Sequence, residues 1–455
     1  MRYLDDILKG VESERIIHHT DKIEGKICFD SREASKGDLF IAFKGTKTDG
    51  HLFLDEVSAK GVSCIICQRL PEKPSPDICY VIVKDSHHAL AAAASNYFRN
   101  PSQEVNLIGV TGTNGKTTIV TLLYNISVSL GFKAGLISTV DIRYHEKVLQ
   151  TTHTTPDPVQ LNNILREMAD GGCEYVFMEV SSHAIHQKRI EGIRFSGAIF
   201  TNISHDHLDY HKTFKEYIKA KKRFFDILDA DAFALINTDD KNGKVMIQNC
   251  LAMTKTYGMR AMADFKGSVL ESHMEGNLMK INRKEVWTRL PGRFNAYNIL
   301  AVYGAGILSG FGEDETLQAI SECKPVAGRF EIIKGLRGIT GVVDYAHTPD
   351  AVQNVLETIQ EIRKEGQRII TLIGAGGDRD KSKRPLMADI AVKLSDLVVF
   401  TSDNPRYENP NDIIEDMTNG LEPSDMQKVL MLVDREEAIR ATCKFADEND
   451  IILAA

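Results

Sequence analysis

The chain has 455 residues, of which 43% are hydrophobic and 26% are charged, and its formal net charge is −8. This length predicts two to four domains, each with enough apolar residues for its own core. The acidic balance and the lack of a long basic run argue against nucleic acid or a membrane surface as a partner. No apolar run approaches the roughly 18 residues of a membrane span, and the first residues lack a signal-peptide core, so we expect a cytoplasmic protein.

Residues 1–102 are expected to form a small α/β domain. The apolar spacing of residues 87–98 predicts a helix. Short apolar runs predict strands at residues 26–29, 38–43, 62–67 and 80–83. Cys64 and Cys67 have the spacing of half a zinc site but lie inside one of these runs. Because no second cysteine pair completes a tetrad, we interpret them as part of a buried core strand.

The most specific signal is the stretch Gly-Val-Thr-Gly-Thr-Asn-Gly-Lys-Thr-Thr at residues 109–118, a short form of the phosphate-binding glycine loop. It follows an apolar run at residues 105–110 and precedes a segment, residues 119–130, with helical apolar spacing. In such a loop the backbone N–H groups and the helix start bind phosphate. Lys116 can reach the terminal phosphates and the Thr117 hydroxyl can ligate Mg²⁺, so we expect ATP or GTP as ligand.

Residues 103–325 are expected to form a second domain around this loop. Further strand-like runs lie at residues 134–139, 175–180, 197–203 and 233–237. Helical segments between them predict a mostly parallel sheet covered on both faces, which binds ligands where its strands end. Glu179 ends one strand and can hold Mg²⁺ with Thr117, while His207, after the next strand, could bind a second cation. Four nearby histidines also allow zinc, but their spacing does not match a structural zinc site, and the neighbouring glycine loop favours magnesium.

Residues 326–455 are expected to form a third, doubly wound α/β domain. Its predicted strands lie at residues 341–344, 368–373, 397–400, 428–433 and 451–455. Polar loops lie between these strands, and one of them, residues 374–380, is rich in glycine. A dinucleotide-binding loop has the spacing Gly-x-Gly-x-x-Gly. This loop lacks that spacing because Asp378 and Arg379 occupy its end, so binding of NAD or FAD is not favoured.

In combination and order, these motifs resemble those of the Mur ligase family, the ATP-dependent amide-forming enzymes of bacterial cell-wall synthesis. The resemblance covers nearly the whole chain. Besides the glycine loop it rests on HTTPD at 153–157, EVSSHA at 179–184, DHLDYH at 206–211, GRFNAYN at 292–298, GRFE at 328–331, DYAHTPD at 344–350, GGDRDKSKRP at 376–385 and DNPR at 403–406. It implies a peptidoglycan-synthesis ligase in which ATP activates the D-glutamate carboxylate of UDP-N-acetylmuramoyl-L-alanyl-D-glutamate as an acyl phosphate. An amino acid then attacks with its amine.

The resemblance also implies roles for residues at matching motif positions. The residues implied to bind ATP are Gly112, Thr113, Asn114, Gly115, Lys116, Thr117, Thr118, Asn295, Asn298, Arg329, Asp344 and His347. The residues implied in catalysis are Lys116, Glu179, His207 and Lys221. Thr117 and Glu179 would ligate one Mg²⁺, and His207 a second together with Lys221, which CO₂ would convert to a carbamate with an anionic oxygen. Three lysines crowd this helix, so a solvated helix face is the alternative for Lys221.

Two further sets of residues are implied to bind the other substrates. Those for the UDP-linked dipeptide are Ser31, Thr154, Thr155, Ser181, Gln187 and Arg189. Those for the amino acid are Arg379, Asp403, Asn404, Pro405 and Arg406. Family members with an arginine at the position of Arg406 resemble the meso-diaminopimelate-adding type, because a guanidinium can pair with the second carboxylate of diaminopimelate and would repel lysine.

Several alternatives stay open from the sequence. A lysine-adding ligase of the same family is the nearest one. A folylpolyglutamate synthetase leaves the HTTPD and DNPR stretches unexplained, and a non-catalytic nucleotide-binding protein would be expected to lack Lys116, Glu179 or Lys221. In the family the last strand runs on into a Gly-Lys-Gly-His-Glu loop, so we expect a truncated chain that adds its amino acid poorly. We expect a monomer that neither enters a membrane nor binds nucleic acid.

Overall fold

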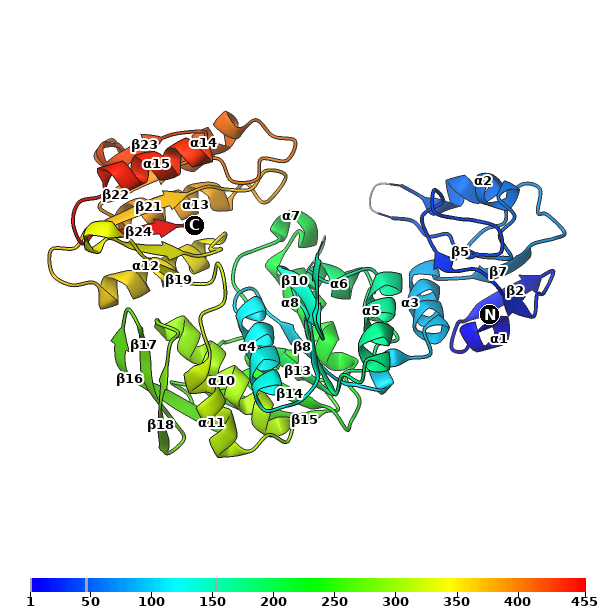
Figure 1. The fold of residues 1–455 in the computed structure, drawn as a ribbon. Helices are drawn as coiled ribbons and strands as arrows, with labels where there is room; N and C mark the ends of the chain where they lie inside the picture. The colour runs from blue at the N-terminus through cyan, green and yellow to red at the C-terminus, as the bar shows by residue number, and fades with distance from the viewer. Residues whose placement is uncertain (1, 46–47, 152–153) are drawn as a thin grey trace. The chain divides into compact units, whose positions relative to one another are not determined.

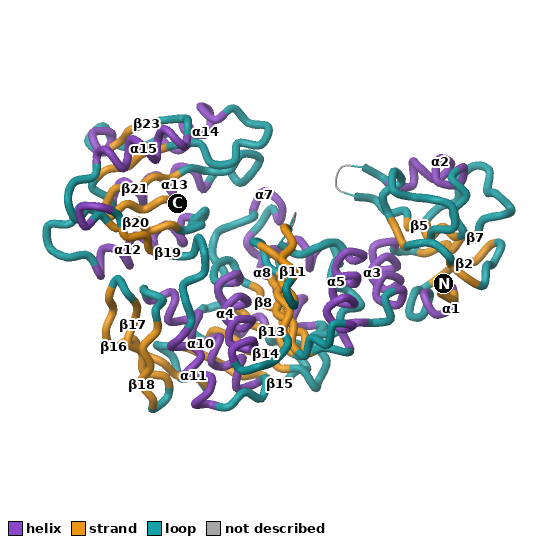
Figure 2. The backbone as a smooth tube through the Cα atoms, in the orientation of Figure 1, coloured by secondary structure: helices purple, strands orange, loops and turns teal. Residues whose placement is uncertain are grey.

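The structure is a computed structural model that describes residues 2–45, 48–151 and 154–455. It contains two compact units. The first comprises Met1–Gly109, Gly131–Ala198 and Ile227–Ala232. The second comprises Val110–Leu130, Ile199–Asp226 and Phe233–Ala455. Strands and helices alternate through both units (Figure 1, Figure 2), so the expected α/β fold class is confirmed.

The first unit begins with a five-stranded sheet in the order β2-β7-β6-β5-β4. Strands β4 to β7 are parallel and β2 pairs antiparallel with β7. The strands and helices of this part are β1 (Arg2–Tyr3), α1 (Leu4–Ile7), β2 (Ser13–Ile17), β3 (Lys22–Ile23), β4 (Ile27–Cys28), β5 (Leu39–Ile41), η1 (Gly50–Phe53), α2 (Leu54–Ala59), β6 (Cys64–Cys67), β7 (Cys79–Val83) and α3 (Ser86–Tyr97). The strands and the helix expected from the sequence are therefore present.

Cys64 and Cys67 are fully buried in β6, so the interpretation as a core strand is confirmed. They belong to apolar clusters on opposite faces of the sheet. Cys64 packs with residues of α1 and α3, whereas Cys67 packs with residues of α2. Because alternate side chains of a strand point to opposite faces, two thiols three residues apart in β6 cannot converge on one metal ion.

An eleven-stranded sheet follows, in the order β11-β10-β9-β12-β8-β13-β14-β15-β16-β17-β18. Its strands are β8 (Asn106–Thr111), β9 (Ala134–Ile137), β10 (Asp141–Tyr144), β11 (Lys147–Gln150), β12 (Tyr175–Glu179), β13 (Gly197–Phe200), β14 (Phe233–Asn237), β15 (Met253–Gly258), β16 (Phe265–His273), β17 (Gly276–Ile281) and β18 (Lys284–Thr288). Strand β12 is parallel to β9, and β15 is parallel to β14 and β16. Antiparallel hairpins, which the sequence did not predict, form both edges.

Helices connect these strands, and two of them, α4 and α10, lie next to the glycine loop. They are η2 (Pro101–Gln103), α4 (Lys116–Ser129), α5 (Pro158–Asp170), α6 (Ser182–His186), α7 (Leu208–His211), α8 (Phe214–Asp226), α9 (Gly243–Met246), α10 (Arg293–Leu308) and α11 (Glu313–Glu322). Helix α4 begins directly after the glycine loop and α10 packs against it. Both helices are apolar almost all round, as expected of helices enclosed within a domain.

The last part of the second unit is a six-stranded sheet in the order β19-β20-β24-β21-β22-β23. All its pairs are parallel except β19 with β20. Its strands and helices are β19 (Glu331–Lys334), η3 (Leu336–Gly338), β20 (Thr340–Val343), α12 (Pro349–Ile362), β21 (Ile369–Ile373), α13 (Lys383–Leu394), β22 (Leu397–Phe400), α14 (Pro410–Thr418), η4 (Asp425–Lys428), β23 (Val429–Met431), α15 (Arg435–Phe445) and β24 (Ile451–Ala454). Separate apolar clusters pack α12 to α14 on one face and α15 on the other, which makes the sheet doubly wound.

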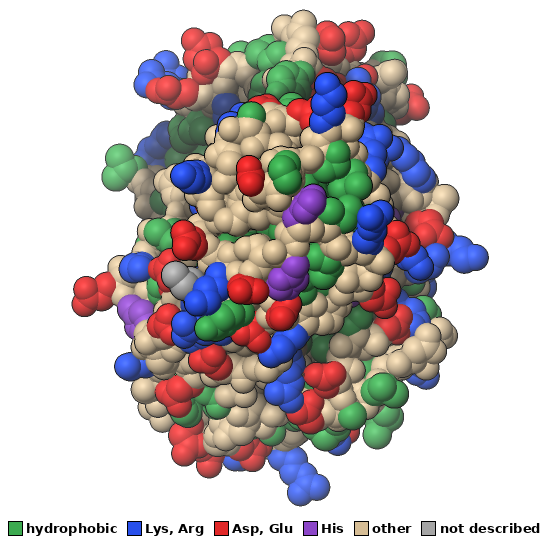
Figure 3. Space-filling view, turned by 90° about the vertical axis from the view of Figure 1, so that its right-hand side faces the viewer, with side chains coloured by type: hydrophobic (Ala, Val, Ile, Leu, Met, Phe, Trp, Pro, Cys, Tyr) green, Lys and Arg blue, Asp and Glu red, His purple; other side chains and the backbone are tan. Residues whose placement is uncertain are grey.

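The surface carries charges of both signs. On the face that Figure 3 shows, acidic and basic side chains are interspersed. Among the described residues, no helix has both the length and the apolar character that a membrane crossing requires.

Candidate active site

The glycine loop connects β8 to α4 without room for side chains at two positions. A Cβ atom on Gly112 would lie 1.8 Å from Thr201 Oγ1, and one on Gly115 would lie 2.5 Å from Asn298 Oδ1. Gly115 also has a φ of +89°, a conformation that L-residues adopt only with strain. Lys116 folds back over the loop, and its Nζ donates to the backbone oxygens of Gly112 and Thr113 at 3.0 and 2.7 Å.

Two asparagines of α10 support this loop from beneath. Asn295 and Asn298 are both buried in the first turns of the helix. Asn298 Nδ2 donates to Asn295 Oδ1 at 3.1 Å, and Asn295 Nδ2 donates to the oxygen of Pro291 at 2.9 Å. Asn298 lies directly beside Gly115, and Asn295 holds the Asn298 side chain. The binding of nucleotide by these two residues stays a prediction.

Arg329, which lies just before the first strand of the six-stranded sheet, contacts the start of α4. Arg329 Nη2 donates to Thr117 Oγ1 at 2.9 Å, and its guanidinium lies 4.9 Å from the centre of the Tyr345 ring. Asp344 Oδ2 accepts from the N–H of Phe330 at 2.8 Å. Burial raises the pKa of Asp344 to about 6, against the opposing effects of Arg329 and the Phe330 N–H. This carboxyl therefore titrates closer to neutrality than an ordinary aspartate.

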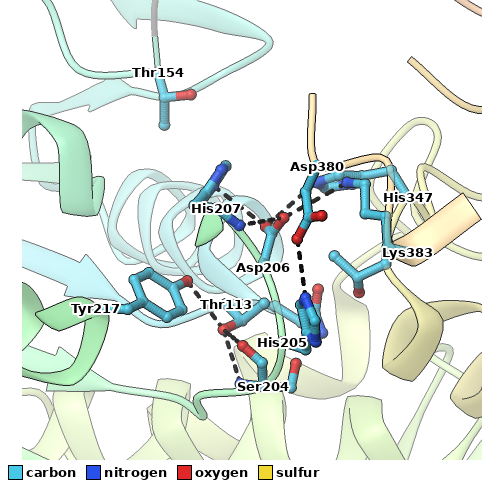
Figure 4. A network of polar contacts seen from close by, with 12 residues as sticks. Thr113, Thr154, Ser204, His205, Asp206, His207, Tyr217, His347, Asp380 and Lys383 are labelled. Carbon is cyan, nitrogen blue, oxygen red and sulfur yellow. Dashed lines mark hydrogen bonds and ion pairs between the residues drawn. The ribbon is translucent and has the colours of Figure 1, made fainter. Parts of the chain in front are cut away.

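Asp206 is the centre of a buried charge cluster (Figure 4), and the sequence did not single it out. Its carboxylate lies 3.2 Å from His207 Nε2, 3.5 Å from Lys383 Nζ and 3.9 Å from His347 Nε2. Burial alone would raise the pKa of Asp206, but the charges of His207, Lys383 and His347 hold it well below its usual range. Asp206 thereby orients the His207 ring. Next to it, His205 Nε2 lies 2.9 Å from Asp380 Oδ2.

The signal for Asp206 was present in the sequence, as the carboxylate between two histidines of His-Asp-His. Lys383 likewise lies in the GGDRDKSKRP motif, next to other basic residues. Neither pattern shows which side chain is buried in the fold, so the sequence indicated the histidines as candidate ligands and not Asp206 or Lys383.

Lys221 is the most deeply buried of the three neighbouring lysines Lys219, Lys221 and Lys222 of α8. It is only 1% exposed, its Nζ donates to the Gly112 oxygen at 2.7 Å, and it lies 4.8 Å from the centre of the Tyr217 ring. Lys219, in contrast, is largely exposed. Burial, followed by the charge of Lys116, lowers the pKa of Lys221 well below its usual value, although Asp206 acts in the opposite direction. A solvated helix face does not describe Lys221.

Glu179 ends β12 in the first unit, where it is 1% exposed. Its Oε1 accepts from the Thr139 N–H at 2.7 Å and its Oε2 lies 3.0 Å from the Thr139 hydroxyl. That hydroxyl also contacts Thr154 Oγ1 at 3.1 Å. Thr139 thus holds the Glu179 carboxylate at the end of its strand through two contacts. His153, which precedes Thr154, lies outside the described residues.

The residues implied for the dipeptide gather beside Glu179, with one exception. Thr155 Oγ1 donates to the Glu179 backbone oxygen at 2.9 Å and accepts from the Ser181 N–H at 3.2 Å. Arg189 donates to the Thr155 oxygen at 2.9 Å and, through two nitrogens, to Gln187 Oε1. Ser31 is the exception, since it lies in the loop after β4, where its backbone oxygen accepts from Lys60 Nζ.

The residues implied for the amino acid lie on two loops that touch. The Gly377 N–H donates to the Asn404 oxygen at 2.9 Å, and Arg406 Nη1 donates to the Gly377 oxygen at 2.6 Å. Pro405 packs its carbonyl against Gly377. Arg379, Asp403, Asn404 and Arg406 all keep exposed side chains. Two guanidinium groups are therefore presented to solvent next to backbone that is closely packed.

Three family models match the chain in succession. Residues 26–102 match the Mur ligase family, catalytic domain; residues 110–306 match the Mur ligase middle domain; and residues 328–455 match the Mur ligase, glutamate ligase domain. This chain belongs to the Mur ligase family. This Mur ligase is 52% identical over 453 residues to a protein of Cytophaga hutchinsonii named UDP-N-acetylmuramoyl-L-alanyl-D-glutamate–2,6-diaminopimelate ligase, covering 99% of this chain and 93% of that one.

Two further comparisons agree with this membership. A protein of the same name from Phocaeicola vulgatus is 51% identical over 452 residues, which cover 99% of this chain and 93% of that one. A solved structure titled UDP-N-acetylmuramoyl-L-alanyl-D-glutamate–2,6-diaminopimelate ligase superposes with a TM-score of 0.68 at 29% identity. The superposition covers 96% of this Mur ligase and 92% of that chain.

The close contact between Gly115 and Asn298 predicts that Gly115→Ala weakens nucleotide binding. The added Cβ meets Asn298 Oδ1, and the positive φ adds about 1–2 kcal/mol of backbone strain. Calorimetric titration with ATP should show an affinity loss of at least about tenfold. Gly131→Ala is the matched control, since Gly131 has a φ of +90° with nothing within 4 Å of its Cβ. That variant should keep its ATP affinity, and an equal loss in both variants would refute the steric explanation.

The cluster at Asp206 predicts a pH-dependent loss of stability in Asp206→Asn. Removing the carboxylate leaves Lys383 buried without its anion, which should lower the melting temperature at pH 7 by about 5 °C or more. Because the pKa of Asp206 is depressed in the folded state, its contribution exists above the pKa of an unfolded aspartate and disappears as the pH falls through the folded-state value. The difference between variant and wild type should therefore shrink in acid. Melting curves of the exposed Asp209→Asn variant, which should match wild type, provide the control.

Proposed function

We propose that this Mur ligase joins meso-diaminopimelate to UDP-N-acetylmuramoyl-L-alanyl-D-glutamate, with conversion of ATP to ADP and phosphate, in peptidoglycan synthesis. The observation that carries the proposal is the exposed Arg406 on the loop packed against Gly377, in a chain whose relatives of that name align over almost its full length. Diaminopimelate differs from lysine by one carboxylate, and a guanidinium is the side chain that best pairs with a carboxylate.

The reaction requires activation of a carboxylate before an amine can attack it. The D-glutamate side chain takes the terminal phosphoryl group of ATP, which gives an acyl phosphate and ADP. The amine of diaminopimelate then attacks the acyl carbon, and phosphate leaves as the amide forms. The task of the protein is to hold the reactants together and to balance the negative charge of the phosphoryl group in transfer.

Lys116, which follows the glycine loop, and Arg329 would supply the positive charge that balances the transferring phosphoryl group. Lys116 has a flexible side chain on the loop and would turn from the Gly112 and Thr113 oxygens to the terminal phosphates. Arg329 stands at the start of α4 and would add a second positive charge. The remaining residues proposed around ATP are Gly112, Thr113, Asn114, Gly115, Thr117, Thr118, Asn295, Asn298, Asp344 and His347.

The proposed ligands are of the chemical type that magnesium prefers. The hydroxyl of Thr117 and the carboxylate of Glu179 are both hard oxygen donors, and each would ligate Mg²⁺ in the proposed enzyme. His207, oriented by Asp206, and a carbamate on Lys221 would hold a second ion. Bound Mg²⁺ would neutralise phosphate charge during transfer. For Lys221, the buried and neutral amine is the form that reacts with CO₂.

The other substrate sites complete the proposal. Residues 1–102 would bind the uridine part through Ser31, residues 103–325 ATP and the dipeptide, and residues 326–455 the amino acid. The proposed dipeptide contacts are Thr154, Thr155, Ser181, Gln187 and Arg189. The proposed amino-acid contacts are Arg379, Asp403, Asn404, Pro405 and Arg406. We further propose that the enzyme acts in the cytoplasm as a monomer, without nucleic acid or membrane partners.

Phosphate release from ATP tests the proposed function. With Mg²⁺ and the UDP-linked dipeptide, release should require meso-diaminopimelate and should not occur with L-lysine. In Arg406→Ala, kcat/KM for diaminopimelate should fall by about 10- to 100-fold, because a charge-assisted pair is lost. Arg440→Ala, at an exposed arginine of α15, should behave as wild type. Equal rates with both amino acids, or an unchanged Arg406→Ala enzyme, would contradict the assignment.

Incubation with ¹³C-bicarbonate tests the carbamate. The low pKa of Lys221 leaves more of its amine neutral at a given pH than in an exposed lysine, so a ¹³C carbamate signal should form at neutral pH. The signal should vanish in Lys221→Ala and persist in Lys219→Ala. A signal that survives in Lys221→Ala would place the carbamate elsewhere.

A further inference from the structure

Arg384 is a buried arginine that none of the roles above uses. It stands in the first turn of α13 and is 1% exposed, which places it among the largest fully buried side chains of the described residues. A guanidinium withdrawn from water is costly unless several acceptors surround it. The identity of those acceptors therefore indicates what the residue is for.

The acceptors of Arg384 come from the two loops of the candidate amino-acid site and from the helix behind them. Nη1 donates to Glu408 Oε2 at 3.0 Å and to Asp416 Oδ2 at 2.7 Å. Nη2 donates to Glu408 Oε1 at 2.9 Å and to the Gly376 oxygen at 3.2 Å. The guanidinium thus holds the glycine-rich loop by its backbone and the segment after Arg406 by a two-point carboxylate pair.

Glu408 binds the same loop from the other side. Its Oε1 accepts from the Asp378 N–H at 2.5 Å, and Lys381 Nζ lies 2.9 Å from its Oε2. Its own N–H donates to the Pro405 oxygen at 2.9 Å. The hydrogen bonds from Arg384 have the largest effect on the pKa of Glu408. Together with those from Lys381 and the Asp378 N–H, they lower this pKa to about 2. The carboxylate is therefore charged at any physiological pH and joins the two loops directly.

The backbones of the two loops that Arg384 and Glu408 join are closely packed against each other. A Cβ on Gly377 would lie 1.9 Å from the Pro405 oxygen, so the loops touch backbone to backbone. Asp378 and Arg406 both have a φ of +50°, a strained conformation that persists only where the surroundings impose it. The strained residue Arg406 lies two positions before Glu408, and its guanidinium rests on the Gly377 oxygen.

We propose that Arg384 and Glu408 form a clamp that fixes the Arg406 guanidinium in place and thereby sets the preference for an amino acid with a second carboxylate. This inference rests on the proposed function. Arg384 does not itself reach the substrate, because it is buried behind the loops, so it is a positioning residue. A purely structural role would lower stability without altering the choice of amino acid.

The test is Arg384→Met, which removes the charge and keeps most of the length. KM for meso-diaminopimelate should rise and its kcat/KM should fall by about 10- to 100-fold, because displacement by about 1 Å suffices for such a loss. The ratio of activity with diaminopimelate to activity with L-lysine should fall as well. KM for ATP and for the UDP-linked dipeptide should change by less than about twofold. Glu408→Gln, which keeps the shape of the carboxylate, should shift the same ratio less strongly and serves if Arg384→Met does not fold.

Arg368→Met is the matched control. Arg368 pairs with the buried Asp450 at 2.6 Å in the same domain, but it precedes β21, whereas the two loops follow β21 and β22. It should lose stability and keep the KM for diaminopimelate. If both arginine variants melt lower but neither changes the amino-acid parameters, the clamp is structural and the inference is wrong.

Hydrogen exchange separates failure of this inference from failure of the proposed function. Arg384→Met should raise amide exchange in residues 374–380 and 402–408, and Arg368→Met should not. Wild-type enzyme that is inactive with diaminopimelate would overturn the proposed function and, with it, the selectivity part of the inference. Wild-type activity combined with unchanged exchange and kinetics in Arg384→Met would overturn the clamp alone.

Discussion

Two lysine side chains converge on one carbonyl oxygen, and the geometry of the glycine loop depends on that convergence. The Nζ atoms of Lys116 and Lys221 lie 3.0 and 2.7 Å from the Gly112 oxygen. Two ammonium groups on one acceptor repel each other, and burial denies Lys221 the water that would spread its charge. Burial and the charge of Lys116 both lower the pKa of Lys221, which eases this repulsion.

The cost of burying a charge also determines how the other buried charged residues are arranged. Asp206 lies among Lys383, His207 and His347, and Arg384 lies among Glu408 and Asp416. In each case one buried charge has more than one polar or charged partner, and at least one of these partners comes from a segment distant in the sequence. Such clusters are costly to disrupt by a single change, because every remaining member loses part of its compensation. They fix loops whose backbone alone has little regular structure.

The sequence predicted those features that depend on neighbouring residues. The glycine loop between β8 and α4 was predictable because the need for Gly112 and Gly115 is steric and local. Hidden strands such as β6 were predictable from uninterrupted apolar runs. The hairpins formed by β16, β17 and β18 were not predictable from the sequence. Their strands mix buried and exposed residues and therefore contain no uninterrupted apolar run. Arg384 was missed for a related reason: it follows Lys381 and Lys383 in a basic run typical of a solvated surface, and only distant carboxylates bury it.

The strand order of the six-stranded sheet has a consequence for how the protein reaches its native state. Strand β20 does not pair with β21, the next strand along the chain, because β24 lies between them and pairs with both. The ribosome delivers β21, β22 and β23 before β24, so the early strand β20 must wait with one edge unpaired. Pairings between such distant segments are slow to form. We therefore expect this sheet to close only after β24 has been synthesised, while β20 and β21 until then expose edges that could pair with other chains.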